Sequence, residues 1–177
     1  MQKEIRLGRC YGLIWTIRPS AFGGIAAAWA ILGSAAAALL KTPWGAAAVL
    51  GLAAALLHWL SEAWHQVGHA SAARRTGHPM TGVRFWGMLS TSLYPADEGP
   101  LPAQVHVRRA LGGPAASLLL TLVAGCTVLA LREAPGNLRD LALFCFVENL
   151  LVFTLQALVP LGFNDGTTLW HWLRENR

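Results

Sequence analysis

Four long apolar runs, separated by short charged stretches, dominate this sequence of 177 residues. The first run, 21–40, contains one polar residue, Ser34. Its length at about 1.5 Å per helical residue covers the roughly 30 Å hydrocarbon core of a bilayer. The other runs cover 45–60, 115–131 and 141–161. Only 13% of the residues are charged, against about a quarter in a soluble domain. We therefore expect one domain over 1–177, an all-α polytopic membrane protein with about four transmembrane helices.

The distribution of cationic residues predicts the orientation in the membrane. Four spans leave both termini on one side, and eleven of the 14 lysines and arginines fall on that side. They are Lys3, Arg6, Arg9, Arg18, Arg74, Arg75, Arg84, Arg108, Arg109, Arg174 and Arg177. The positive-inside rule then places both termini in the cytoplasm. The lipid bilayer is an expected partner, whereas no basic-aromatic patch indicates nucleic acid. Arginine outnumbers lysine 12 to 2, which hints at a GC-rich bacterial genome and a bacterial cytoplasmic membrane.

The stretch 76–107 is too polar to cross a membrane. Its apolar residues Val83, Phe85 and Leu89 lie on either side of Gly87, a pattern that predicts a short β-hairpin. After the fourth run, Asp165 and the following residues lead into a short amphipathic helix. We therefore expect small hairpin or edge-strand elements on the cytoplasmic side of the helices.

Polar residues at the end of the second run indicate a metal site. His65 and His69 are four residues apart, so on a helix both imidazoles project from one face, as two ligands of a tetrahedral zinc do. Two helical histidines are a weak signal by themselves, and a pair of hydrogen-bonded core histidines is the alternative. Polar groups in a spanning helix are costly, which favours a functional role. Asp165, at the end of the fourth span, is placed to supply a third ligand at the same depth.

Several separate stretches resemble the site-2 protease family of intramembrane zinc metalloproteases. Residues 65–69 have the HExxH pattern with Gln66 in place of glutamate, and residues 113–117 resemble the GPxxS opening of the family's third helix. The other matching stretches are Arg6–Arg9 with Gly12–Ser20, Gly68–Gly77, and the closing motif with Asn149, Pro160 and Asp165–Gly166. This resemblance implies that His65, His69 and Asp165 bind Zn²⁺, and that position 66 serves as the general base.

Gln66 is the main departure from the family pattern. A carboxylate at this position takes a proton from zinc-bound water, whereas a carboxamide of nearly the same shape cannot accept a proton near neutral pH. We therefore expect a metal site with impaired catalysis. The substitution is either natural or introduced to trap an inactive enzyme, and the otherwise intact surroundings of position 66 favour the second explanation.

Two other carboxylates, one just after the second apolar run and one within the fourth, are candidates for the base. Glu62 shares the helix face of His65, but helical Cα–Cβ bonds lean towards the N-terminus, which points its side chain away from the metal. Glu148 lies 17 residues before Asp165, about 25 Å along a helix. We expect hydrogen-bonded, non-catalytic roles for both.

The resemblance also implies a transmembrane protein or peptide as substrate, cleaved near the cytoplasmic face. The hairpin either pairs with an unwound substrate segment as an added strand, or merely connects two helices. We assign Val83, Phe85, Gly87, Leu89 and, from the closing motif, Asn149 to substrate binding. A separate membrane protein is the expected regulator. The main alternative is a non-catalytic scaffold of the same fold that binds transmembrane partners, and a metal carrier is a weaker one.

Overall fold

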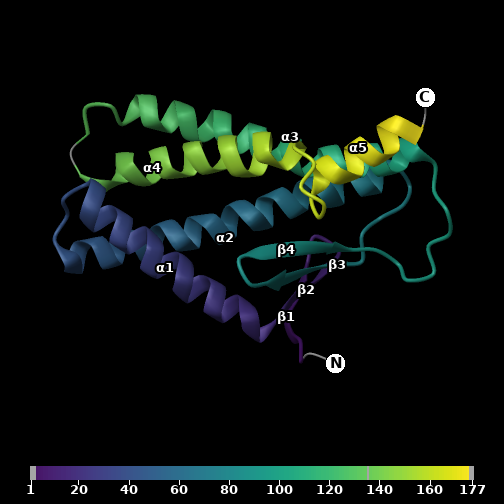
Figure 1. Cartoon of the computed structure of the whole chain (residues 1–177), viewed down its shortest axis with the longest axis horizontal. Coiled ribbons are helices and arrows are strands. Elements are labelled where there is room, and N and C mark those ends of the chain that lie inside the picture. Colours follow the sequence, from purple (N-terminus) through teal and green to yellow (C-terminus); the bar gives the residue numbers. More distant parts are fainter. Residues whose placement is uncertain (1–2, 135, 176–177) are drawn as a thin grey trace.

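The computed structural model describes residues 3–134 and 136–175, so Arg177 lies outside the described residues. Four helical segments are long and apolar enough to cross a membrane, as the sequence predicted. They are α1 (Pro19–Leu39), α2 (Trp44–Arg75), α3 (Ala103–Ala130) and a fourth, composite segment (Asn137–Leu158). In Figure 1, α2, α3 and the fourth segment extend roughly along the long axis of the molecule, whereas α1 runs obliquely to them. The α1–α2 and α3–α4 connections lie at one end, and the small sheet and α5 (Asp165–Glu175) lie towards the other.

The helix boundaries have local causes. Pro19 is at the first turn of α1, where its fixed φ and missing N–H are tolerated. α2 has 32 residues, about 48 Å at 1.5 Å each, and so exceeds the hydrocarbon core. Arg74 and Arg75 occupy its last turn, where cations interact favourably with the helix dipole. α3 begins at Ala103, twelve residues before the expected apolar run, and so includes Arg108 and Arg109.

The fourth segment differs from the single regular helix that its hydropathy predicts. α4 (Asn137–Glu148) continues as the π-helix η1 (Asn149–Leu155) and a 3₁₀ turn, η2 (Gln156–Leu158). The change begins at Asn149, whose side-chain amide donates to Cys145 O and to Ser61 Oγ of α2, at 2.9 Å each. A side chain that bonds the backbone one turn earlier competes with the regular helical ladder. Phe153 of the π-helix and Ala157 of the 3₁₀ turn lie beside the candidate site described below.

A four-stranded sheet accompanies the helices, in the order β1 (Ile5–Cys10), β2 (Leu13–Ile17), β3 (Gly82–Trp86) and β4 (Leu89–Leu93). β2 and β3 are parallel, and the other two pairs are antiparallel. The expected hairpin is therefore present as β3–β4, with Gly87 in its turn at a φ of +53°. The sequence analysis missed β1 and β2, which precede α1. Among the described strands, β2 and β3 are inner strands, and β1 and β4 are the edge strands of the sheet.

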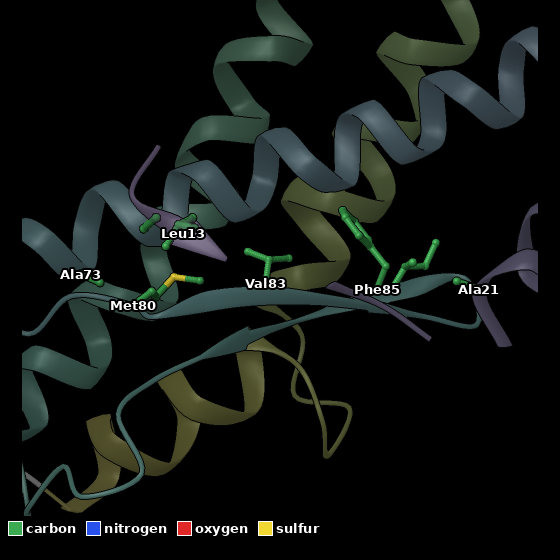
Figure 2. Packing of buried hydrophobic residues seen from close by; sticks show 8 residues of the cluster. Leu13, Ala21, Ala73, Met80, Val83 and Phe85 are labelled. Atoms are coloured by element: carbon green, nitrogen blue, oxygen red, sulfur yellow. The ribbon is translucent and has the colours of Figure 1, made fainter. Parts of the chain in front are cut away.

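The sheet packs on the C-terminal half of α2. Leu13 of β2 and Val83 of β3 are fully buried against the small residues Ala70 and Ala73, and Phe85 belongs to the same cluster (Figure 2). Alanines on this face of α2 allow the strands to approach the helix closely. The sheet is thus held beside the half of α2 that carries His65 and His69.

Glycines allow α2 and α3 to approach even more closely. A Cβ added to Gly68 would lie 2.3 Å from Gly112 O, and one added to Gly112 would lie 2.6 Å from Gly68 O. Larger residues at either position would force the two helices apart. This contact places the middle of α3 directly behind the histidines of α2.

Candidate metal centre

The structure brings the three predicted ligands together. His65 and His69 project from one face of α2, and Asp165 is the first residue of α5. Asp165 Oδ2 lies 3.2 Å from Nε2 of His65 and 3.2 Å from Nε2 of His69. The three potential ligand atoms lie within 4.8 Å of one another. Residues from two helices far apart in the chain therefore form one cluster. A metal site requires such proximity of its ligand atoms.

Further hydrogen bonds orient the imidazole rings of His65 and His69. His65 Nδ1 lies 2.9 Å from Ser117 Oγ, and His69 Nδ1 donates to the backbone oxygen of Arg109 at 2.8 Å. Ser117 is fully buried. These bonds point both Nε2 atoms towards Asp165, and such partners fix the tautomer and the ring orientation of metal-binding histidines. α3 supplies both partners, a role that the sequence analysis did not assign to it.

Asp165 is positioned by the start of α5. The side-chain oxygen of Asn164 accepts a hydrogen bond from the backbone N–H of Thr167 at 3.2 Å, which is the N-cap arrangement. A Cβ added to Gly166 would lie 2.5 Å from the backbone of Val159, so glycine lets α5 begin tightly against the end of η2. Burial alone would raise the pKa of Asp165, but hydrogen bonds with His65 and His69 outweigh it and lower the pKa to about 2. The carboxylate is therefore ionised and ready to act as a ligand at neutral pH.

Gly113 lies beside the ligand atoms, although it stands among small residues of the kind that pack helices together, as the neighbouring Gly112 does. A Cβ on Gly113, however, would lie 2.3 Å from His69 Nε2 and 2.4 Å from His65 Nε2. Zinc–nitrogen bonds are about 2.0–2.1 Å long. The absent side chain of Gly113 thus leaves free the space that a metal shared by both histidines would need.

Gln66 lies beside these ligands and is 4% exposed. Its side-chain oxygen accepts a hydrogen bond of 2.7 Å from Ser92 Oγ of β4. One turn earlier on α2, Glu62 Oε1 accepts hydrogen bonds from the backbone N–H and the hydroxyl of Ser90. Two polar residues of α2 therefore hold the edge strand β4. The hydrogen-bonded role expected for Glu62 agrees with this placement.

A cavity of about 500 Å³ opens beside the cluster. α2, β4, η1 and α5 contribute to its wall, and so do Gln156 and Ala157 of η2. The residues that line it include the three candidate ligands and their neighbours: Glu62, His65, Gln66, His69, Leu89, Ser90, Ser92, Phe153 and Asp165. The candidate ligands and the general-base position thus face one common space.

Arg109 connects the cavity wall to the loop before α3. Its guanidinium donates to both carboxylate oxygens of Glu98, at 2.8 and 2.6 Å, and stands 4.1 Å over the ring of Tyr94. The hydrogen bond with Arg109 lowers the pKa of Glu98 below its usual value. Burial raises the pKa of Tyr94 to about 12. This contact fixes the same residue whose backbone oxygen orients His69.

The residues assigned to substrate binding lie in different surroundings. Leu89 lines the cavity, whereas Val83 and Phe85 are in the core between the sheet and α2. Gly87 forms the hairpin turn, and Asn149 is fully buried in its bonds with Ser61 and Cys145. A role of these residues in substrate binding stays a prediction.

The donor set fits zinc. Two imidazole nitrogens and one carboxylate oxygen are ligands that zinc accepts, and a set of three protein ligands leaves a fourth position for water, as in catalytic zinc sites. The donors are buried or nearly so, and both histidines have the outer partners that such sites use.

Comparison with known proteins finds a solved structure with a similar fold. Its fold is similar to that of the site-2 protease from Methanocaldococcus jannaschii, with a TM-score of 0.64 and 14% sequence identity. The match covers 99% of this chain and 73% of that chain. No protein-family model and no curated protein sequence matches the chain. At this identity the likeness shows the fold alone, which is that of a four-helix, site-2-protease-like membrane protein.

Proposed function

We propose that this chain is the core of an intramembrane zinc metallopeptidase of the site-2 type, impaired in this form by Gln66. Its substrates are transmembrane segments of membrane-anchored proteins, cleaved near the cytoplasmic face in regulated intramembrane proteolysis. The observation that carries the proposal is the convergence of His65, His69 and Asp165 on one point beside a cavity that position 66 also lines.

The residues divide the chemistry among them. His65, His69 and Asp165 would hold Zn²⁺, which when bound lowers the pKa of a coordinated water towards neutrality. Ser117 and the backbone oxygen of Arg109 keep both imidazoles aimed at the shared position. Gln66 occupies the place from which a carboxylate would take up and return a proton, and its amide cannot do so. In this proposal His65, His69 and Asp165 form the metal site, and a different residue, Gln66, causes the loss of catalysis.

β4 is suited to hold an unwound substrate segment. It is an edge strand, and four of its residues, from Leu89 to Ser92, line the cavity. An extended peptide added to this edge would have its backbone hydrogen bonds satisfied by protein, where lipid offers none. Because Glu62 already accepts from the N–H of Ser90, substrate pairing at that point requires Glu62 to give up this bond.

The decisive experiment replaces the side-chain amide NH₂ group at position 66 by an oxygen. In Gln66→Glu, the carboxylate can keep the hydrogen bond from Ser92 and can also accept a proton. We expect the variant, reconstituted in vesicles with zinc and a panel of single-span membrane proteins, to cleave at least one of them within its transmembrane segment. The unaltered chain and the double variant Gln66→Glu/Asp165→Asn should cleave none.

Zinc content, measured by elemental mass spectrometry, accompanies each assay. About one zinc per chain in the unaltered protein, lost in Asp165→Ala, is the expected result. A Gln66→Glu variant that binds zinc and cleaves no member of the panel would contradict the protease proposal.

That outcome would favour the second candidate, a non-catalytic membrane scaffold, which the presence of Gln66 itself supports. In this case the same fold binds transmembrane partners without cutting them, and partner binding is equal with Gln66 or glutamate. A separate regulatory membrane protein, and residence in a bacterial cytoplasmic membrane with cytoplasmic termini, are compatible with both candidates.

A further inference from the structure

A second cavity, which we call the α1–α4 groove, lies between α1, α2 and α4. Its volume is about 480 Å³, and Val152 of η1 lines both this groove and the cavity of the metal centre. Leu39, Leu143 and Val147 along its rim are exposed, so the groove faces the surroundings of the helices. Figure 1 shows α1 close to α4 at one end of the molecule and diverging from it towards the sheet.

The groove is apolar except for two carboxylates on α4, Asp140 and Glu148. Asp140 lies in the first turn of α4, where a negative charge interacts favourably with the helix N-terminus. Glu148 is the last residue of α4, just before the π-helix. A favourable interaction with the helix N-terminus therefore does not explain its negative charge. An acidic residue in an otherwise apolar wall at membrane depth is expensive and marks function by default.

Only half of the Glu148 carboxyl group has a partner. Oε1 lies 2.7 Å from His58 Nδ1, and His58 Nε2 donates to the backbone oxygen of Met88 in the β3–β4 turn at 3.1 Å. Oε2 is buried and has no hydrogen-bond partner among the described residues. Glu148 also lines the groove, and the terminal torsion of a glutamate is soft, so its carboxyl group can turn to accept a further hydrogen bond there. A hydrogen-bond donor from outside the chain would satisfy Oε2.

The depth of Glu148 relates it to the metal centre. Its partner His58 precedes His65 by seven residues on α2, about 10 Å along the helix axis. A chain that runs from the metal centre to Glu148 covers this distance with about three extended residues or seven helical ones. One transmembrane segment can therefore reach both places.

We propose that the α1–α4 groove docks the transmembrane helix of the substrate, and that Glu148 selects helices carrying a hydrogen-bond-donating side chain at its depth. Such a donor stands about three to seven residues from the bond that lies at the metal centre. The inference rests on the proposed function for the identity of the occupant, but its test measures binding and requires no cleavage.

The test uses the full chain in phosphatidylcholine–phosphatidylglycerol vesicles and two fluorescent transmembrane peptides. Both are alanine–leucine helices of about 20 residues, a length that spans the bilayer. They are identical except for glutamine or leucine at one position, two helical turns below the cytoplasmic interface. Energy transfer to the labelled chain measures their affinities. Hydrogen bonds between helices in membranes predict that the glutamine peptide binds about 3- to 30-fold more tightly.

Three variants identify the source of this preference. Glu148→Met removes the acceptor at similar length and should abolish the preference for glutamine. Ala35→Trp fills the groove from α1 and should weaken the binding of both peptides, so it decides the question even if Glu148→Met fails to fold. Glu133→Gln removes an exposed carboxylate in the loop after α3 and should change neither affinity. Unchanged helical content in each variant, measured by circular dichroism, serves as the control for folding.

Equal binding of the two peptides to the unaltered chain would overturn the proposal and leave lipid acyl chains as the occupant. Self-association of the chain without peptide, lost in Ala35→Trp, would overturn it in favour of a second copy. A glutamine preference that persists in Glu148→Met would assign the selection to another residue. None of these results depends on whether Gln66→Glu cleaves a substrate, so failure of the docking proposal and failure of the protease proposal are separable.

Discussion

Replacing Gly113 by alanine adds one methyl group at the point where the two histidines converge. The added Cβ would lie 2.3 Å from His69 Nε2 and 2.4 Å from His65 Nε2. Ordinary contacts between such atoms are about 3.5 Å or longer, so each imidazole must retreat by about 1 Å. The methyl group would also occupy the space in which a metal bound to both nitrogens has to lie.

The expected loss of zinc affinity follows from the outer hydrogen bonds. The Nδ1 bonds to Ser117 and to Arg109 O are 2.9 and 2.8 Å long. A displacement of about 1 Å in an unfavourable direction takes both beyond hydrogen-bonding distance. Loss of one such partner costs about 10- to 100-fold in metal affinity. We therefore expect Gly113→Ala to bind zinc at least about 100-fold more weakly than the unaltered chain.

The assay is competition for zinc against a chromophoric chelator in detergent, together with thermal unfolding monitored by circular dichroism. Gly23→Ala is the matched control, because a Cβ on this helical glycine of α1 meets nothing within 4 Å. It should keep full zinc affinity and the same helical content. Zinc affinity of Gly113→Ala within a few-fold of that of the unaltered chain would refute the reasoning, since it would place the metal elsewhere.

Three further predictions follow from neighbouring contacts. Ser117→Ala removes the partner of His65 Nδ1 and should weaken zinc binding about 10- to 100-fold in the same competition assay. Gly68→Ala places a Cβ 2.3 Å from a backbone oxygen of α3 and should lower the free energy of unfolding by about 1–3 kcal/mol, measured by denaturant titration. Arg109 lowers the pKa of Glu98 in the folded chain. The contact between the two residues therefore stabilises the fold fully above the pKa that Glu98 has in the unfolded chain. This stabilisation is lost as the pH falls through the lowered pKa of the folded state. The hydrogen-exchange protection factors of residues 94–102, which correct for the intrinsic pH dependence of exchange, should therefore fall under acid conditions.

Each of these predictions has its own contrary result. Ser34→Ala, an exposed serine of α1, controls for serine loss, and equal zinc affinities of the two serine variants would remove Ser117 from the site. Unchanged stability of Gly68→Ala would show that α2 and α3 can move apart without cost. In a Glu98→Gln variant the protection factors of this segment should be nearly independent of the acid transition, and a variant whose protection still falls as in the unaltered chain would contradict the role of the Glu98–Arg109 contact.

The spans and the ligand candidates were predictable from the sequence because their signals are local. An apolar run of about 20 residues fits one bilayer whatever the rest of the chain does. The spacing of His65 and His69 fixes a common face on any helix. The hairpin at Val83–Leu93 has its turn glycine and its alternating pattern within a dozen residues. For these features neighbouring residues contain most of the information.

Features that depend on distant partners were missed or assigned differently. β1 and β2 form strands because β2 pairs with β3, which follows in the chain only after α1 and α2. The π-helix begins where Asn149 finds Ser61, on another spanning helix. Gly113 stands among small residues typical of helix packing, and only its distance from the histidines reveals its place beside the candidate metal centre. No pattern along the chain encodes such distances.

The sequence by itself determined the membrane class, the number of spans, the ligand candidates and the presence of an amide instead of an acid at position 66, since each follows from residue type and short spacing. The tertiary structure alone decided that Asp165 meets both histidines, that α3 orients them, and that β4 is held by Glu62 and Gln66. It also placed Glu148 in a groove between helices. The physical reason is that hydrogen bonds and close packing join atoms by their positions in space, which long-range folding sets and local sequence does not.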